Sequence, residues 1–105
     1  MIVLESVDKW YNRGEINEVH ALKDIDLQVR KSEIVCIKGP SGSGKSTLLS
    51  IIGCLFVPTS GLALLDGIKL SRLPDRFLTV YRREKIGFIF QRFQLIPELS
   101  VLANV

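Results

Sequence analysis

One stretch of the chain combines the residue types that can hold a polyphosphate. It reads Gly39, Pro40, Ser41, Gly42, Ser43, Gly44, Lys45, Ser46 and Thr47, and it fits the spacing G-x-x-x-x-G-K-S/T. Its glycines let main-chain N–H groups converge on a small volume where a Cβ would obstruct. Lys45 supplies a cation for the β- and γ-phosphates, and Ser46 supplies a hydroxyl for Mg²⁺. The stretch therefore predicts a site for the phosphates of a nucleotide, with Thr47 as a further donor near the α-phosphate.

The segments on either side give this stretch the context that a phosphate-binding loop requires. Residues 33–38 are rich in β-branched side chains, which predicts a strand. After the loop, apolar residues recur at i, i+3, i+4 and i+7, which predicts a helix; they are Leu48, Ile51, Ile52 and Leu55. A helix that begins at the loop points its positive dipole end at the same phosphates. These flanks argue against the alternative of a merely flexible Gly/Ser loop.

Other stretches predict antiparallel strands outside the phosphate-binding core. Residues 2–7 form an opening strand, and residues 21–30 alternate apolar and polar side chains, as a half-buried antiparallel strand does. Asp66 and Gly67 separate two short apolar runs and both tolerate the positive φ of a two-residue hairpin turn. We therefore expect an α/β fold in which a P-loop core carries an antiparallel β appendage.

The C-terminal part of the chain predicts a helix, a buried strand and a helix cap. Pro74 and Asp75 suit the first turn of a helix expected over residues 74–83. Residues 86–90 are apolar on both faces, which is typical of a central parallel strand. Ser100 is expected to cap a further helix near Val105.

Two side chains outside the loop are candidates for contact with a nucleotide. Tyr11 offers a flat ring on which a purine base could stack, although it could instead only cover the edge of the sheet. Gln91 follows the strand expected at 86–90, and side chains at the carboxyl ends of such strands face the ligand. It could bind Mg²⁺ or orient a water, and an ordinary turn amide is the alternative. His20 is expected to be an exposed loop residue rather than a catalyst or ligand.

Composition and charge exclude several classes of protein. The 105 residues, 47% of them apolar and 24% charged, suit one small globular domain or part of one. No apolar run approaches the ~18 residues of a membrane span, and no signal peptide is evident, so a cytoplasmic location is expected. Residues 68–92 hold seven Lys or Arg and two Asp or Glu, but no nucleic-acid motif accompanies them. We expect a solvated basic surface, no nucleic-acid partner, and free buried thiols at Cys36 and Cys54.

Several segments together resemble the N-terminal half of the ATP-binding subunit of an ABC transporter. These segments are Lys9-x-Tyr11 and residues 21–27, 39–47, 58–61 and 86–91, so the similarity runs essentially end to end. Residues 51–55 and 90–97 look most like the macrolide-export and lipoprotein-release branch. Two positions differ from the family pattern. Ser32 stands where a turn glycine is usual, at a cost of up to ~1 kcal/mol if its φ is positive, and Phe56 stands where an aspartate is common.

The resemblance implies a role for each candidate residue and a set of partners. Tyr11 would stack on adenine, residues 39–47 would form the Walker A loop around ATP, and Ser46 and the Q-loop residue Gln91 would bind Mg²⁺. Residues 1–105 would be the N-terminal part of one ABC-type nucleotide-binding domain, ending after the Q-loop. The implied partners are a second ATP-binding subunit in a head-to-tail dimer and a membrane permease. The permease would hold the protein at the inner face of the membrane.

The resemblance also implies an incomplete core without catalytic residues. The family's signature motif, Walker B segment and switch histidine are not in this sequence, so we expect MgATP binding without hydrolysis by the isolated chain. If the neighbours of strand 33–38 are absent as well, that strand would expose unpaired backbone and apolar side chains, and the isolated chain would be marginally stable.

Two other functions compete with the transport ATPase. A small nucleotide kinase has a similar loop, but such kinases usually open with the phosphate-loop strand, whereas 38 residues precede Gly39 here. The second alternative is a nucleotide-binding or dimerisation module without turnover, which would pair with a full-length subunit.

Overall fold

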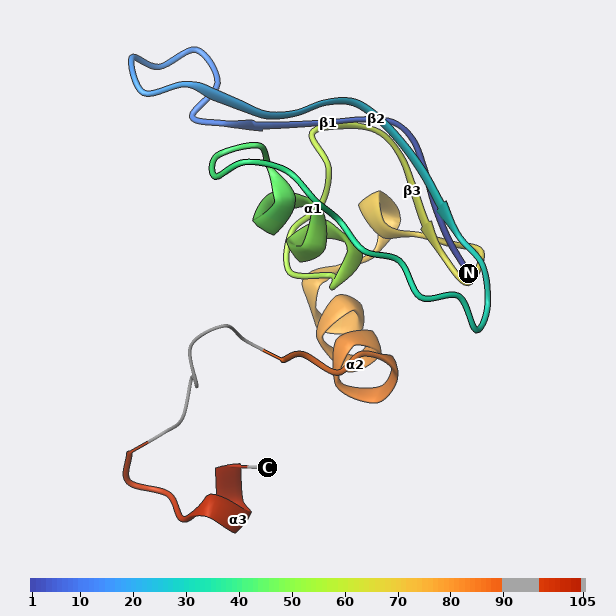
Figure 1. Ribbon diagram of the computed structural model, residues 1–105, viewed down its shortest axis with the longest axis vertical. Coiled ribbons are helices and arrows are strands. Elements are labelled where there is room, and N and C mark those ends of the chain that lie inside the picture. Colours follow the sequence, from blue (N-terminus) through green and yellow to red (C-terminus); the bar gives the residue numbers. More distant parts are fainter. Residues whose placement is uncertain (90–96, 105) are drawn as a thin grey trace.

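The computed structural model describes residues 1–89 and 97–104, and it is built on one curved antiparallel sheet (Figure 1). The sheet has four strands in the order β2-β1-β3-β4. Their bounds are Ile2–Tyr11 for β1, Val19–Val29 for β2, Ser60–Leu65 for β3 and Ile68–Lys69 for β4. The strands predicted near the N-terminus and around the hairpin are therefore confirmed. The expected antiparallel appendage is the larger part of the described fold.

The helices lie on one side of this sheet in Figure 1. They are α1 (Lys45–Ile52) and α2 (Asp75–Lys85), with the short 3-10 helix η1 (Leu70–Arg72) before α2 and α3 (Val101–Asn104) near the C-terminus. The buried core joins α1 and α2 to the inner face of the sheet. It comprises Leu4, Val7, Leu22, Ile51, Cys54, Ala63, Leu65, Leu70 and Leu78.

Several local predictions are confirmed in detail. Asp66 and Gly67 have φ of 50° and 80°, as a type I′ turn between β3 and β4 requires. Pro74 immediately precedes α2, whose last turn carries Arg82, Arg83 and Lys85. The Ser100 hydroxyl accepts a hydrogen bond from the Ala103 N–H at 3.2 Å at the start of α3. These features depend on residues close together in sequence, so local chemistry specifies them.

The strand predicted at 33–38 is not formed. In Figure 1 the chain after β2 runs back alone towards α1, without a partner strand among the described residues. A β-strand needs a hydrogen-bonded neighbour, whereas the preference of β-branched residues for extended backbone does not depend on one. Ile34 is 98% exposed and Val35 43%. Exposure of apolar side chains here is what we expected if the neighbouring strands were absent.

Other predictions also need correction. Residues 86–89 do not form a strand either, and Phe90, the end of that predicted element, lies outside the described residues. Cys36 is exposed rather than buried, whereas Cys54 is buried as expected and its burial raises the pKa of the thiol. Helix α1 ends at Ile52, so Leu55 lies beyond the helix and is 46% exposed.

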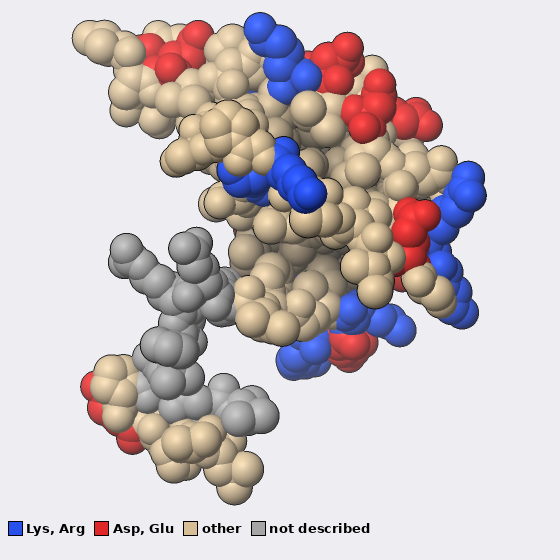
Figure 2. All heavy atoms as spheres, viewed as in Figure 1, with Lys and Arg blue, Asp and Glu red and all other residues tan. Residues whose placement is uncertain are grey.

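The surface of the described part carries mixed charge. Figure 2 shows basic and acidic side chains interspersed along the edge of the face in view. Within α2, the Arg82 guanidinium donates to the Cys54 carbonyl at 2.7 Å, and so ties this helix to the turn after α1. No helix in residues 1–89 or 97–104 has the length and apolar character that crossing a membrane requires.

Candidate phosphate-binding site

The loop before α1 adopts the conformation that its glycines permit. Gly42 and Gly44 have φ of 80° and 95°, in the left-handed region that residues with a Cβ seldom adopt. A Cβ added at Gly44 would lie 2.5 Å from the carbonyl oxygen of Ala21, whereas one at Gly42 would meet nothing within 4 Å. Gly42 is therefore required for its backbone conformation alone, and Gly44 also lets the loop approach β2 closely.

The main chain of the loop leads directly into the N-terminus of α1. The Ser43 N–H donates to the Pro40 carbonyl at 3.2 Å, and the Leu48 N–H donates to the Gly44 carbonyl at 2.9 Å as the first helical bond. The first turn of a helix leaves its leading N–H groups without helical acceptors. In α1 these groups belong to Lys45, Ser46 and Thr47. They form a set of donors suited to an anion.

The Lys45 ammonium lies within the loop itself. It donates hydrogen bonds to the carbonyl oxygen of Gly39 and, at 2.8 Å, to that of Pro40. The cation of the motif is thus held by carbonyl groups of its own loop, and Lys45 is also the first residue of α1. Its contact with phosphate stays a prediction.

A cavity of about 670 Å³ opens between this loop and the ends of β1 and β2. Its size falls in the range of small-molecule sites, roughly 300–1,000 Å³. The lining brings together residues far apart in sequence: Tyr11, Val19, His20, Ala21, Ser41, Gly42, Gly44, Lys45, Ser46 and Thr47. The predicted residues Gly39, Pro40 and Ser43 are in the loop but are not part of this lining. Gln91 lies outside the described residues.

Tyr11 is fixed on the cavity side of β1 by several neighbours. Its hydroxyl lies 3.4 Å from the Thr47 hydroxyl. Its ring meets the edge of the Phe56 ring, with centroids 6.2 Å apart and an interplanar angle of 82°. The Lys9 ammonium lies 5.4 Å from the centre of the Tyr11 ring. The structure thus joins the candidate base-stacking residue to the phosphate loop.

Sequence reasoning missed the roles of Lys9 and Phe56. The Lys9 ammonium also donates to the Val57 carbonyl at 3.0 Å and lies 5.5 Å from the centre of the Phe56 ring. Phe56 was singled out only as a departure from the family pattern. That departure could have indicated the contact between Phe56 and Tyr11, because an aromatic residue in place of a carboxylate gives Tyr11 a ring to pack against.

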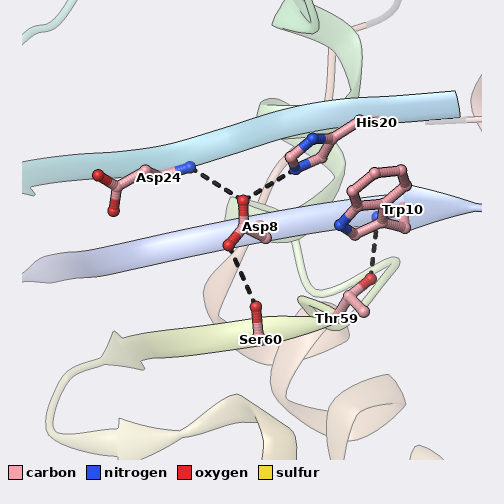
Figure 3. Close-up of polar contacts among 6 residues, drawn as sticks. All are labelled: Asp8, Trp10, His20, Asp24, Thr59 and Ser60. Atoms are coloured by element: carbon pink, nitrogen blue, oxygen red, sulfur yellow. Dashed lines mark hydrogen bonds and ion pairs between the residues drawn. The ribbon is translucent and has the colours of Figure 1, made fainter.

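His20 is not the exposed loop residue that we expected. It lies in β2, half-buried, and its Nε2 is 2.9 Å from Asp8 Oδ1 (Figure 3). This hydrogen bond, followed by the one from the Asp24 N–H, lowers the pKa of the Asp8 carboxyl. An ionised carboxylate only accepts hydrogen bonds, so His20 Nε2 is the donor. The partners are twelve residues apart, and only the pairing of β1 with β2 brings them together.

The site can contribute to a magnesium complex but cannot enclose the ion by itself. In the described parts of the chain no group of three or more His, Cys, Asp or Glu side chains could hold a metal. The Ser46 side chain is exposed at the cavity. Mg²⁺ is commonly held by one or two protein oxygens together with phosphate oxygens and water. Ser46 therefore fits a metal that arrives with a nucleotide.

Comparisons with known protein families and with curated proteins find matches of one kind. A family model described as ABC transporter matches residues 22–104. An ABC transporter ATP-binding protein of Methanocaldococcus jannaschii, MJ0796, is 53% identical over all 105 residues, which cover 44% of that protein. The macrolide export ATP-binding/permease protein MacB of Neisseria gonorrhoeae is 44% identical over the whole chain, which covers 16% of it.

Solved structures give the same result. A dimeric, post-hydrolysis structure of the cassette MJ0796, bound to ADP and Pi, matches with a TM-score of 0.92 and 52% identity. The match covers 100% of this chain and 45% of that one. A second dimeric structure of the same cassette matches with a TM-score of 0.91. The chain thus spans less than half the length of these relatives.

Proposed function

Because this chain belongs to the ABC transporter family and forms part of an ATP-binding cassette, we propose that the cavity at its phosphate loop binds ATP together with Mg²⁺. The observation that carries this proposal is the cavity lining itself. It combines the aromatic ring of Tyr11 with the donors and the cation of the loop. A flat ring and a cluster of phosphate donors are complementary to the two ends of ATP.

Each part of ATP has a proposed set of contacts. The N–H groups of the first turn of α1 and the ammonium of Lys45 hold the triphosphate. Ser46 contributes its hydroxyl to Mg²⁺, and Gln91, which lies outside the described residues, is proposed as a second ligand. Tyr11 stacks on adenine. The magnesium neutralises phosphate charge in such sites.

Hydrolysis needs a positioned base that activates the attacking water. No carboxylate lines the cavity within the described residues, and the His20 imidazole, which does line it, is hydrogen-bonded to Asp8 and stacked on Trp10. We therefore propose that the 105-residue chain binds MgATP without turning it over. In the whole protein, residues outside this chain would complete the ATPase. The binding-only module without turnover is thus the activity proposed for the isolated chain.

The whole protein is proposed to act in transport across a membrane. Relatives support this proposal: MacB is named as an export ATP-binding/permease protein, and the archaeal cassette is dimeric in its solved structures. By analogy, two ATP-binding subunits would pair head to tail and couple ATP hydrolysis to export or lipoprotein release through a permease. The ATP-binding subunit would then lie at the cytoplasmic face of the membrane.

Substitution of Lys45 tests the binding site. We expect Lys45→Ala to weaken MgATP binding by roughly 10-fold or more, because a charge-assisted contact to phosphate is lost. Lys31→Ala is the matched control, since Lys31 is exposed and does not line the cavity. Competition of ATP against a fluorescent nucleotide measures both, with circular dichroism to verify the fold. Equal affinities in the two variants would overturn the proposal.

A second measurement addresses turnover. Phosphate release by the purified chain is expected to stay at the level of buffer with MgATP. Sustained release that disappears in Lys45→Ala would show that the chain is itself an ATPase, contrary to the proposed binding-only role.

A further inference from the structure

The pairing of β1 with β2 is interrupted just before the residue that faces the nucleotide cavity. The register shifts between Leu4 and Val7, between Val7 and Lys9, and again between Lys9 and Trp10. Each such irregularity leaves ladder hydrogen bonds unmade and bends the strand. Beyond the last shift, Trp10 pairs with His20 and Tyr11 with Val19. The position of Tyr11 therefore depends on a pairing of β1 with β2 that regular main-chain hydrogen bonds do not maintain by themselves.

Side-chain contacts of Asp8 tie the strands together at this interruption (Figure 3). Asp8 Oδ1 accepts from His20 Nε2 at 2.9 Å and from the Asp24 N–H at 3.0 Å, both in β2. Asp8 Oδ2 accepts from the Ser60 hydroxyl in β3 at 3.3 Å. One carboxylate thus links β1 to the strand on either side of it. These are charge-assisted hydrogen bonds, which are stronger than neutral ones.

A second set of contacts orders the strand end beside this carboxylate. The His20 ring stacks on the Trp10 ring, with centroids 3.8 Å apart and an interplanar angle of 9°. The Trp10 main-chain N–H donates to the Thr59 hydroxyl at 2.9 Å. Successive side chains of a strand point to opposite faces of the sheet. The stack therefore holds Trp10 on one face while Tyr11, the next residue, faces the loop.

The arrangement of Asp8, His20 and Ser60 is not that of a hydrolytic triad. In a triad the imidazole lies between the carboxylate and the hydroxyl and takes the proton of the hydroxyl. Here the hydroxyl of Ser60 donates to the carboxylate, on the oxygen opposite the one that accepts from His20. The described contacts include no hydrogen bond between the imidazole and this hydroxyl, so we assign the group a structural role.

We propose that Asp8 and His20 are positioning residues that set the affinity for the base of the nucleotide by fixing Tyr11. This inference rests on the proposed binding of ATP and extends it to residues outside the phosphate loop. A slip of one residue in pairing would turn the side chains at the end of β1 to the other face of the sheet. Tyr11 would then leave its place beside Thr47. The phosphate loop, which is anchored in α1, would keep its donors.

Two ligands separate this role from a general loss of structure. ATP uses both the ring of Tyr11 and the loop, whereas inorganic tripolyphosphate with Mg²⁺ uses the loop alone. We expect Asp8→Ala and His20→Ala to weaken ATP binding by roughly 5- to 10-fold. This loss corresponds to part of the affinity that stacking of a base on an aromatic ring contributes. Tripolyphosphate binding is expected to change by less than about twofold, because the charged contacts at the loop are kept.

Matched variants sharpen the test. Asp8→Asn should restore ATP affinity, because its amide oxygen can accept the bonds made to Oδ1 while the Ser60 hydroxyl turns to accept from the amide NH₂. Glu5→Ala, at an exposed position of the same strand, should leave both affinities unchanged. Asp8 is not among the residues that line the cavity, so an effect at Asp8 equal to that at His20 identifies positioning rather than direct contact with the base.

The outcomes are distinct. A parallel fall in affinity for both ligands would show a general structural role and overturn the inference, as would unchanged ATP affinity in Asp8→Ala and His20→Ala. If Asp8→Ala proves unfolded by circular dichroism, Thr59→Ala decides the question with the same two ligands, because it removes the acceptor of the Trp10 N–H and Thr59, unlike His20, does not line the cavity. If the unsubstituted chain binds neither ligand, the proposed function itself fails.

Discussion

The Tyr11 hydroxyl lies 3.4 Å from the Thr47 hydroxyl, so the end of β1 touches the first turn of α1 directly. This contact joins an antiparallel strand to the helix that carries the phosphate loop. The two segments are 36 residues apart in sequence. Both residues line the cavity in which we propose that ATP binds.

Substitutions of Tyr11 should separate the ring from its hydroxyl. Tyr11→Phe removes only a long hydrogen bond and is expected to change ATP affinity by less than about threefold, in keeping with a contribution well under ~1 kcal/mol. Tyr11→Ala removes the ring and should weaken ATP binding by roughly 10-fold. Neither should alter tripolyphosphate binding, and competition titrations measure all four values. Equal ATP affinities for Tyr11→Ala and the unsubstituted chain would exclude stacking.

Gly44→Ala should destabilise the chain and abolish binding together. The added Cβ meets the Ala21 carbonyl oxygen at 2.5 Å in a backbone with φ of 95°, so clash and strain act at once. We expect the free energy of unfolding to fall by more than ~2 kcal/mol, as measured by urea denaturation. Gly14→Ala is the control, because its φ is 86° but nothing lies within 4 Å. Gly14→Ala should lower the free energy of unfolding by only about 1 kcal/mol. An equal decrease in both variants would show that the clash at Gly44 does not destabilise the chain.

Ser32→Gly should stabilise the chain. Ser32 has φ of 64°, so the cost that the sequence comparison anticipated for a non-glycine residue at this turn is present. Relief of that strain, partly offset by the greater freedom of glycine in the unfolded chain, is expected to raise the free energy of unfolding by up to ~1 kcal/mol. Ser71 does not have a positive φ, so Ser71→Gly should instead lower the free energy of unfolding. A urea midpoint for Ser32→Gly at or below that of the unsubstituted chain would contradict this account.

Tyr81 should make stability fall in alkaline solution. Burial, with the hydrogen bond that its hydroxyl donates to Asp66 at 2.8 Å, raises the pKa of Tyr81 from 10.0 to about 12. The folded chain therefore holds this proton more tightly than the unfolded chain does. Its contribution to stability is complete below pH 10 and is lost as the pH rises from 10 to about 12.

Comparison with Tyr81→Phe isolates this effect from the titration of lysines. The difference in urea midpoint between the two chains should be constant below pH 10 and change as the pH approaches 12. A difference that does not depend on pH over this range would show that Tyr81 titrates alike in the folded and unfolded chains.

Local patterns predicted several features whose cause lies within a few residues. The phosphate loop, the helix that follows it, the turn at Asp66 and Gly67, and the Ser100 cap all follow from backbone preferences and short-range hydrogen bonds. The positive φ of Ser32 belongs to the same class. The role of Gln91 stays a prediction, because it lies outside the described residues.

Predictions failed where a feature depends on a partner distant in sequence. Residues 33–38 and 86–89 have the composition of buried strands, but strand formation is a property of a pair, and the described residues provide no neighbour for either. Cys36 is exposed for the same reason. His20 was misjudged because its partner Asp8 comes from another strand.

The sequence alone determined the residues of the proposed phosphate site, because glycine spacing, a lysine and a helix start are encoded contiguously between Gly39 and Thr47. Only the tertiary structure placed Tyr11 against that loop and joined Asp8, His20 and Ser60 across three strands. The physical reason is that strand register, set here through several irregular pairings, decides which side chains meet, and no local preference encodes it.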